Sequence, residues 1–325
     1  MKPLFFFSLF ACNKQGTTPA NSEIASTEPQ TSKNTPIEKP AEQPEEANKA
    51  EDNHVWVQDV GLSTPESVLY DKKNDRYLVS NINGKPTDAD DNGFISILTP
   101  DGKVDTLKWI DGASDDVQLS APKGMAILDN TLYVTDINTV RLFDIDSGLP
   151  SGNIELKGST FLNDAVSSGS EIYISDSGMN PDFSPSGTDA IYRIYKEGKY
   201  EKVVADPSFS KPNGLATRGS DIYMVNFGGA ELRVLNAKGE TMQTHTLPKG
   251  SLDGIELRID GSALISSWES NSVYLRKMDG TVETVVSDVD APADIGWDLK
   301  RNRVLVPLFK QNKVLIQPLG PHNAK

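Results

Sequence analysis

Cysteine and histidine are scarce in this chain, and their scarcity excludes several kinds of chemistry. Among 325 residues there is one cysteine, Cys12, so no disulfide can form within the chain. Histidine occurs only at positions 54, 245 and 322, and no His/Cys cluster suggests zinc. Because His54 and His322 lie at the margins of the folded part and His245 falls in an outer strand, the sequence also argues against a Ser-His-Asp triad.

Basic charge and long apolar runs are also lacking. Asp and Glu outnumber Lys and Arg by 46 to 32, which gives a net charge of −14, whereas nucleic-acid binding needs clustered basic side chains. No apolar run reaches the roughly 18 residues that would predict a transmembrane helix. Hydrophobic residues make up 37% of the chain, below the roughly 45–50% of globular proteins. Part of the chain is therefore expected to remain unpacked.

The unpacked part is predicted at the N-terminus. Residues 1–12 read MKPLFFFSLFAC, in which a lysine precedes a short apolar run that ends at Cys12. This pattern resembles a bacterial lipoprotein signal peptide with its lipobox cysteine. Residues 13–53 are rich in Pro, Glu, Ser and Thr and predict a disordered acidic linker. We therefore expect lipidation of Cys12 and a place in the bacterial cell envelope, at its periplasmic side or outer membrane. The lipid would be the only membrane contact.

Residues 54–325 predict an all-β domain built from six repeats. Short alternating strands follow one another at intervals of 8–12 residues, separated by Gly, Asp and Asn turns. Six openings align: Pro65-Glu66-Ser67, Pro122-Lys123-Gly124, Leu162-Asn163-Asp164, Pro212-Asn213-Gly214, Leu252-Asp253-Gly254 and Ala293-Asp294-Ile295. Their middle residues are 57, 40, 50, 40 and 41 positions apart, with insertions at 84–92 and 178–189 behind the two long spacings.

Four strands in each repeat of roughly 40 residues predict a six-bladed β-propeller. The last repeat shows only three strands before the chain ends. We expect the spare strand at residues 54–60 to complete the last blade and so to close the ring.

The middle residues of the six openings are expected to converge on the central channel. They are Glu66, Lys123, Asn163, Asn213, Asp253 and Asp294. Carboxylate and amide oxygens suit a hard cation such as calcium, and unpaired buried charge is too costly for ordinary packing to favour such a set. Lys123 would oppose a divalent ion unless Asp294 paired with it. The alternative is a water-filled channel lined by a polar network without a ligand.

With these motifs in view, residues 60–318 resemble the six-bladed propellers of the senescence marker protein/gluconolactonase (regucalcin-like) family. Paraoxonases and diisopropyl fluorophosphatase are its more distant relatives. The motifs that carry the resemblance are Asn163-Asp164, Asn213-Gly214-Leu215-Ala216 and Asp253-Gly254-Ile255.

The resemblance implies a metal-dependent hydrolase of a lactone or related ester. Glu66, Asn163, Asn213 and Asp253 would hold the metal, which would be calcium or another divalent ion. Asp253, or Asp294 beside it, would activate water as the general base.

Two functions remain open at this stage. The first is that hydrolase, and the second is a non-catalytic propeller that binds a ligand or protein in a pocket shaped by Lys123, Phe161 and Trp268. Phe161 stands where the family carries a substrate-binding arginine. On either reading we expect a monomer with a small-molecule substrate or ligand and no nucleic-acid partner. The segment at residues 88–93 resembles half of a calcium loop, but its twelfth position is not Glu, so we expect an acidic surface turn there.

Overall fold

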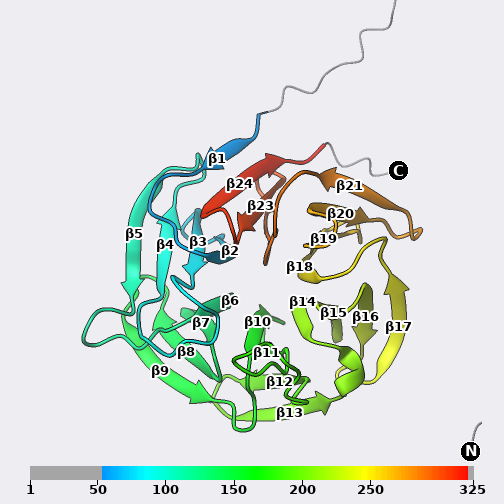
Figure 1. The fold of residues 1–325 in the computed structure, drawn as a ribbon, viewed down its shortest axis with the longest axis horizontal. Helices are drawn as coiled ribbons and strands as arrows, with labels where there is room; N and C mark the ends of the chain where they lie inside the picture. The colour runs from blue at the N-terminus through cyan, green and yellow to red at the C-terminus, as the bar shows by residue number, and fades with distance from the viewer. Residues whose placement is uncertain (1–52, 321–325) are drawn as a thin grey trace, which may run out of the picture. The chain divides into compact units, whose positions relative to one another are not determined.

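The structure is a computed structural model that describes residues 53–320. Cys12, the linker and His322 lie outside the described residues. The described chain folds into six four-stranded antiparallel sheets that follow one another around a ring, as Figure 1 shows. One short 3-10 turn, η1 (Pro207–Phe209), interrupts the strands. No helix in residues 53–320 has the length and apolar character needed to cross a membrane.

The six blades take their strands in chain order from the channel outward, except that the last blade borrows its outer strand. Blade 1 holds β2 (Pro65–Asp71), β3 (Arg76–Asn81), β4 (Phe94–Leu98) and β5 (Val104–Asp111). Blade 2 holds β6 (Pro122–Leu128), β7 (Thr131–Asp136), β8 (Thr139–Asp144) and β9 (Pro150–Glu155). Blade 3 holds β10 (Leu162–Ser167), β11 (Glu171–Asp176), β12 (Ala190–Tyr195) and β13 (Tyr200–Ala205).

The other half of the ring repeats this order. Blade 4 holds β14 (Pro212–Arg218), β15 (Asp221–Asn226), β16 (Glu231–Leu235) and β17 (Thr241–Thr246). Blade 5 holds β18 (Leu252–Leu257), β19 (Ala263–Ser267), β20 (Ser272–Arg276) and β21 (Val282–Val286). Blade 6 holds β22 (Gly296–Asp298), β23 (Arg303–Leu308), β24 (Lys313–Pro318) and, from the start of the domain, β1 (Val55–Val57). The predicted fold is therefore confirmed.

Ring closure by the N-terminal strand is confirmed as well. Strand β1 runs antiparallel to β24, with Trp56 opposite Leu315 (Figure 1). Such a closure joins the first strand of the domain to the last, so neither β1 nor β24 is left without a partner. The seam between blades 6 and 1 is further held by Tyr77, whose hydroxyl donates to Asp298 Oδ2 at 2.6 Å.

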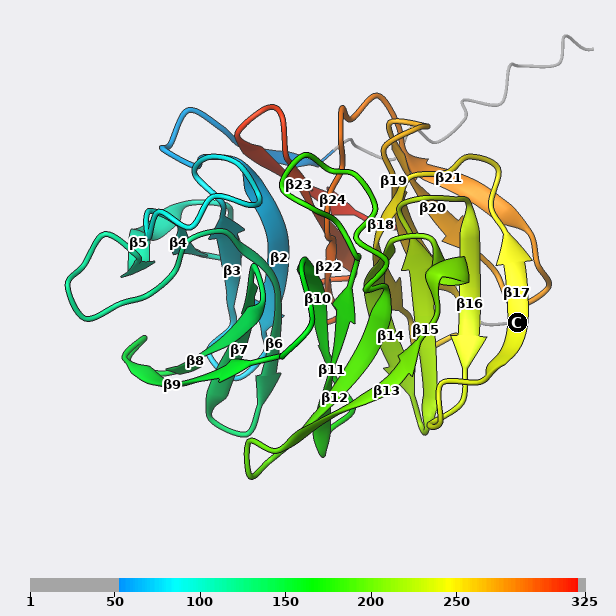
Figure 2. The same cartoon turned by 60° about the horizontal axis from the view of Figure 1, so that its bottom comes forward.

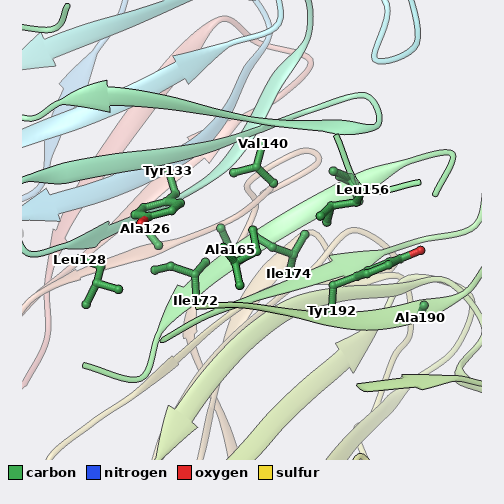
Figure 3. Close-up of a cluster of buried hydrophobic side chains, with 12 residues drawn as sticks. Ala126, Leu128, Tyr133, Val140, Leu156, Ala165, Ile172, Ile174, Ala190 and Tyr192 are labelled. Atoms are coloured by element: carbon green, nitrogen blue, oxygen red, sulfur yellow. The ribbon is translucent and has the colours of Figure 1, made fainter. Parts of the chain in front are cut away.

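The hydrophobic core is divided among the interfaces between blades, because each sheet buries both of its faces against its neighbours. Six clusters of buried side chains each span two adjacent blades. Figure 3 shows the cluster between blades 2 and 3, where Tyr133 and Val140 face Ile172, Ile174 and Tyr192. The oblique view of Figure 2 shows how the blades stand side by side around the channel. This packing fixes the inner strands, which carry the site.

In blades 2 and 3, the aspartate at the end of the second strand holds the loop that leads into the inner strand. Asp136 Oδ1 accepts from the backbone N–H of Ala121 at 2.8 Å, and Asp176 Oδ1 accepts from that of Phe161 at 3.0 Å. Arg141 Nε donates to Asp136 at 2.8 Å and anchors that carboxylate in turn. These bonds fix where Lys123 and Asn163 enter the channel.

Candidate functional site

A local irregularity at the start of the inner strands turns the opening residues toward the channel. In blade 5 the ladder pairs Leu252 with Ser267 and resumes only at Ile255 with Ile265, so two residues lie outside the regular pairing. Blades 2, 3 and 4 carry the same shift. Such bulges re-aim side chains. We call the second residue of each opening the ring position and the next one the third position.

The register of blade 6 corrects the alignment drawn from the sequence. Pro292 bridges Leu308, and Gly296 pairs with Leu305, which makes Ala293 the ring residue and places Asp294 at the third position. The distance from Asp253 to Ala293 is 40 residues, the same as from Asn213 to Asp253. A shift of one residue sends a strand side chain to the opposite side. Asp294 therefore leaves the ring.

The other five ring residues lie together on the floor of one cavity of about 300 Å³, which we call the first cavity. They are Glu66, Lys123, Asn163, Asn213 and Asp253. All five are buried. The sequence thus predicted this convergence correctly for five of six blades.

Three oxygen atoms on this floor are buried without a hydrogen-bond donor. They are Glu66 Oε2, Asn213 Oδ1 and Asp253 Oδ1. A buried acceptor without a partner costs about 1–3 kcal/mol, so three on one floor point to a group that binds there. Hard oxygen donors of this kind fit a cation such as calcium. Among residues 53–320 no group of three or more His, Cys, Asp or Glu side chains is arranged to hold a metal, so two of the four candidate ligands would have to be the asparagine amides.

Burial sets the electrostatics of the two carboxylates. It raises the pKa of Glu66 well above its usual range, with further increases from Asp253 and Asp294, while Lys123 lowers it. Burial likewise raises the pKa of Asp253, as does Asp294, whereas the nearby Trp268 indole and Asn213 amide lower it. Burial therefore disfavours the charged form of both carboxyl groups, and a bound cation would act in the opposite direction.

Lys123 contributes the one cation on this floor, and its side chain is 1% exposed. Its Nζ donates to Ala121 O at 3.0 Å and lies 4.6 Å from the centroid of the Phe161 ring. Burial lowers its pKa to about 8, although Asp136 and Glu66 act in the opposite direction. No carboxylate in the described part of the chain forms an ion pair with it. The sequence left open a pairing of Lys123 with Asp294, but Asp294 lines a different cavity.

The walls of the first cavity are aromatic and apolar except for Lys211. Phe227, Trp268 and Phe309 each follow the second strand of their blade, in blades 4, 5 and 6. Phe161 lines the other side, and Phe183 and Pro86 reach the cavity from the two inserted loops. The sequence reading selected Phe161 and Trp268 and missed Phe309 and Phe183. Phe309 occupies the same position in its repeat as Trp268, and this correspondence could have identified Phe309 from the sequence.

A second cavity of about 350 Å³ is lined by Asp164, Glu256 and Asp294 and has no Lys, Arg or His among its lining residues. Asp164 Oδ2 accepts from the N–H of Leu215 at 2.6 Å and thereby links blades 3 and 4. Asp294 Oδ2 accepts from the Ser67 hydroxyl at 2.5 Å and links blades 6 and 1. Burial raises the pKa of Asp294 to about 7. These carboxylates join blades to one another.

Two other sequence signals lie away from both cavities. The segment at 88–93 is an exposed turn except at its end, and Asp91 accepts from Ser120 Oγ at 3.0 Å. His245 lies on the outer strand β17, where its Nδ1 meets Arg276 Nη2 at 3.0 Å. Neither lines the first cavity.

The fold has known counterparts among solved structures. A gluconolactonase from Xanthomonas campestris matches with a TM-score of 0.62 and 17% identity, over 82% of this chain and 88% of that one. A streptogramin B lyase matches with a TM-score of 0.60 and 14% identity, over 82% and 97%. A catalytically inactive histidine-to-alanine variant of virginiamycin B lyase from Staphylococcus aureus, solved with quinupristin, gives 0.55 and 15%, over 82% and 99%. No protein-family profile and no curated protein matches the sequence. At these identities the likeness shows a shared six-bladed propeller.

Proposed function

We propose that this protein is a divalent-metal-dependent hydrolase, with calcium as the metal, that opens a lactone or a related ester. The observation that carries the proposal is the set of three unpartnered buried oxygens, on Glu66, Asn213 and Asp253, at the floor of one cavity. The gluconolactonase of the same fold supports the reaction class. The chemistry itself is argued from the residues of this chain, because one fold serves many functions.

Glu66, Asn163, Asn213 and Asp253 would hold the cation. Asn163 is oriented by the hydrogen bond from its Nδ2 to Ser177 Oγ at 3.0 Å. Ser177 in turn donates to the carbonyl of Pro212 at 2.6 Å, which joins blades 3 and 4 beneath the site. A divalent cation held there would polarise a substrate carbonyl and stabilise the negative charge that develops on its oxygen.

Asp253 is the candidate general base. Its carboxylate would take a proton from a water molecule whose oxygen bonds to the carbonyl carbon. The bond between that carbon and the ring oxygen then breaks, and the proton returns to the leaving oxygen, which yields a hydroxy acid. Asp294, the other base suggested by the sequence, lines the second cavity, so this proposal does not use it. Burial and Asp294 raise the pKa of Asp253, and the nearby Trp268 indole acts in the opposite direction.

The residues of the first cavity also bear on two other functions. Lys123 on the floor favours a non-catalytic propeller that binds a ligand without a metal. An elimination like that of the lyases has less support, because the variant lyase is inactive without one of its histidines. Neither His54 nor His245 of the described chain lines the first cavity.

The test is calorimetric titration of calcium into the full chain, beside the double variant Glu66→Gln/Asp253→Asn. We expect one binding site that the double variant loses, because both carboxylates become neutral amides of the same size. The matched control is Asp88→Asn/Asp90→Asn, which removes two charges from the exposed turn and should keep the site. Circular dichroism melts check that each variant folds.

A calcium site should then coincide with hydrolysis of a lactone or ester that the double variant cannot perform. Calcium binding that survives Glu66→Gln/Asp253→Asn would place the metal elsewhere. No binding and no hydrolysis would leave the non-catalytic propeller as the function.

Envelope anchoring belongs to the same proposal and rests on Cys12 alone. We expect metabolic labelling with palmitate in a bacterial host to mark the full chain and to leave Cys12→Ala unlabelled. A chain that stays unlabelled would remove the anchor from the proposal without touching the site. A monomer is expected by light scattering of the detergent-free soluble form.

A further inference from the structure

We infer that the ligand of the first cavity is a small, mostly apolar molecule with a ring of aromatic size and a single carbonyl end, and that it is not a polyhydroxylated sugar lactone. The inference builds on the proposed function for the carbonyl end. The apolar body is argued from the cavity walls alone.

One wall is a continuous aromatic surface. The rings of Phe227 and Trp268 meet edge to face, with centroids 5.2 Å apart and planes at 85°. Trp268 and Phe309 are also 5.2 Å apart, with planes at 51°. The three rings come from three successive blades, and each remains partly exposed toward the cavity. Such a surface favours a flat or apolar body through burial and ring-to-ring contact.

Residues from the inserted loops add further aromatic and apolar surface to the cavity. Phe183, on the loop between β11 and β12, is 47% exposed and adopts a positive φ of 63°. A bulky side chain in that backbone region is a true outlier, and strain of this kind gathers at ligand clamps. A ligand in the cavity would cover part of this ring. Buried Met179 and Ile82 also line the cavity, and their side chains offer no hydrogen bond of the kind a hydroxyl needs.

Apart from Lys211, the charged and amide side chains of the cavity lie at its floor. On the walls, the indole N–H of Trp268 is buried without a partner within hydrogen-bonding geometry, and it lies close enough to Asp253 to lower the pKa of that group. A sugar lactone carries hydroxyl groups around its whole ring, and each would lose water against carbon atoms. A molecule with one carbonyl end meets the polar floor with that end and the aromatic wall with the rest. The volume of about 300 Å³ is at the small end of ligand sites, which suits a compact ligand.

The experiment compares lactones of the same ring size. Dihydrocoumarin, an aromatic δ-lactone, and δ-decalactone, an alkyl one, are set against glucono-δ-lactone, and proton release gives kcat/KM for each with calcium present. We expect at least a hundredfold preference for dihydrocoumarin over glucono-δ-lactone. Phe309→Leu should raise KM for dihydrocoumarin about tenfold and change glucono-δ-lactone little, because only the aromatic body contacts that ring.

A second readout needs no turnover. The ketone 2-tetralone has the aromatic body and the carbonyl but no bond to hydrolyse, and it is titrated while tryptophan emission is recorded. We expect quenching in the wild type that disappears in Trp268→Phe, with no response to sorbitol in either.

The outcomes separate the inference from the proposed function. Efficient hydrolysis of glucono-δ-lactone, equal to or above that of dihydrocoumarin, would overturn the inference and leave the hydrolase standing. Quenching by 2-tetralone through Trp268 without hydrolysis of any lactone would support the inference and remove the hydrolase. Absence of both tetralone binding and dihydrocoumarin hydrolysis would overturn the inference.

Discussion

The ammonium of Lys123 lies over the face of Phe161, 4.6 Å from its centroid, on the same floor as the candidate metal ligands. A cation held over an aromatic ring is attracted by the ring's electron-rich face, which draws the lysine toward Phe161. The hydrogen bond of Nζ to Ala121 O, at 3.0 Å, holds it there. The positive charge of Lys123 is therefore held next to Phe161, and no ion pair within residues 53–320 neutralises it.

Replacing this lysine should strengthen calcium binding. At an effective dielectric of about 20, two unit charges roughly 6 Å apart repel by about 3 kcal/mol, and a divalent ion feels about twice that. Even a small part of this repulsion changes affinity about tenfold. We therefore expect Lys123→Met to lower the Kd for calcium at least tenfold, as measured by titration calorimetry.

The matched control is Lys211→Met, which removes a lysine that lines the same cavity but does not come from a ring position. We expect a Kd within threefold of the wild type. An unchanged or weaker Kd in Lys123→Met would show that this ammonium has no bearing on the metal site.

The fold was predictable because the repeat is carried by strand openings and turns, which are local features. The convergence of side chains on one cavity was predictable where one residue per blade decides it, as at Glu66 and Asp253. The prediction failed for Asp294, because the alignment took an aspartate as the ring residue of blade 6, whereas the pairing of Gly296 with Leu305 places Ala293 at the ring position. Most of the aromatic wall residues could not be predicted either, because the sequence does not show how far an inserted loop, such as the one that carries Phe183, folds back over the cavity.

Deletion of the closing strand should weaken the whole ring. Val57 is 2% exposed, and β1 supplies the ladder partner of β24. Burial of its apolar side chains contributes about 1.5–3 kcal/mol for each fully buried one. We expect a chain without residues 1–60 to melt about 10 °C below one without residues 1–52, given about 2–4 °C per kcal/mol for a domain of this size.

The two deletions differ only in the segment that carries β1, so the comparison isolates the closure. Equal melting temperatures by calorimetry would mean that the five complete blades and β22–β24 are equally stable without β1. Concentration-dependent association of the shorter chain alone is the further sign of an open β24 edge.

The hydrogen bond across the seam gives a smaller and sharper prediction. The Tyr77 hydroxyl is buried and donates to Asp298 Oδ2, which also accepts from Arg301 Nη1 at 2.9 Å. Tyr77→Phe removes a bond to a charged acceptor, which is worth about 1.5–3 kcal/mol. We expect a loss of about 2 kcal/mol in the free energy of unfolding by urea titration.

The control variant is Tyr70→Phe, because the Tyr70 hydroxyl donates to Asp75 nearer the surface. This variant should lose less than half as much free energy of unfolding. Equal losses in the two variants would show that the buried hydrogen bond stabilises the fold no more than the one nearer the surface.

The carboxyl of Glu256 in the second cavity makes stability depend on pH. Burial, with a further contribution from Asp294, raises the pKa of Glu256 to about 8, whereas an unfolded chain titrates near 4.3. Between these values the folded state holds a proton that the unfolded state has released, so the free energy of unfolding falls as pH rises. The contribution is complete below about pH 4 and is lost as pH rises through 8.

We expect the melting temperature of the chelator-treated protein to fall from pH 5 to pH 8. Glu256→Gln should flatten that slope and the exposed Glu197→Gln should leave it unchanged. A wild-type melting temperature that stays level or rises over this range, or a Glu256→Gln curve parallel to it, would contradict the assignment.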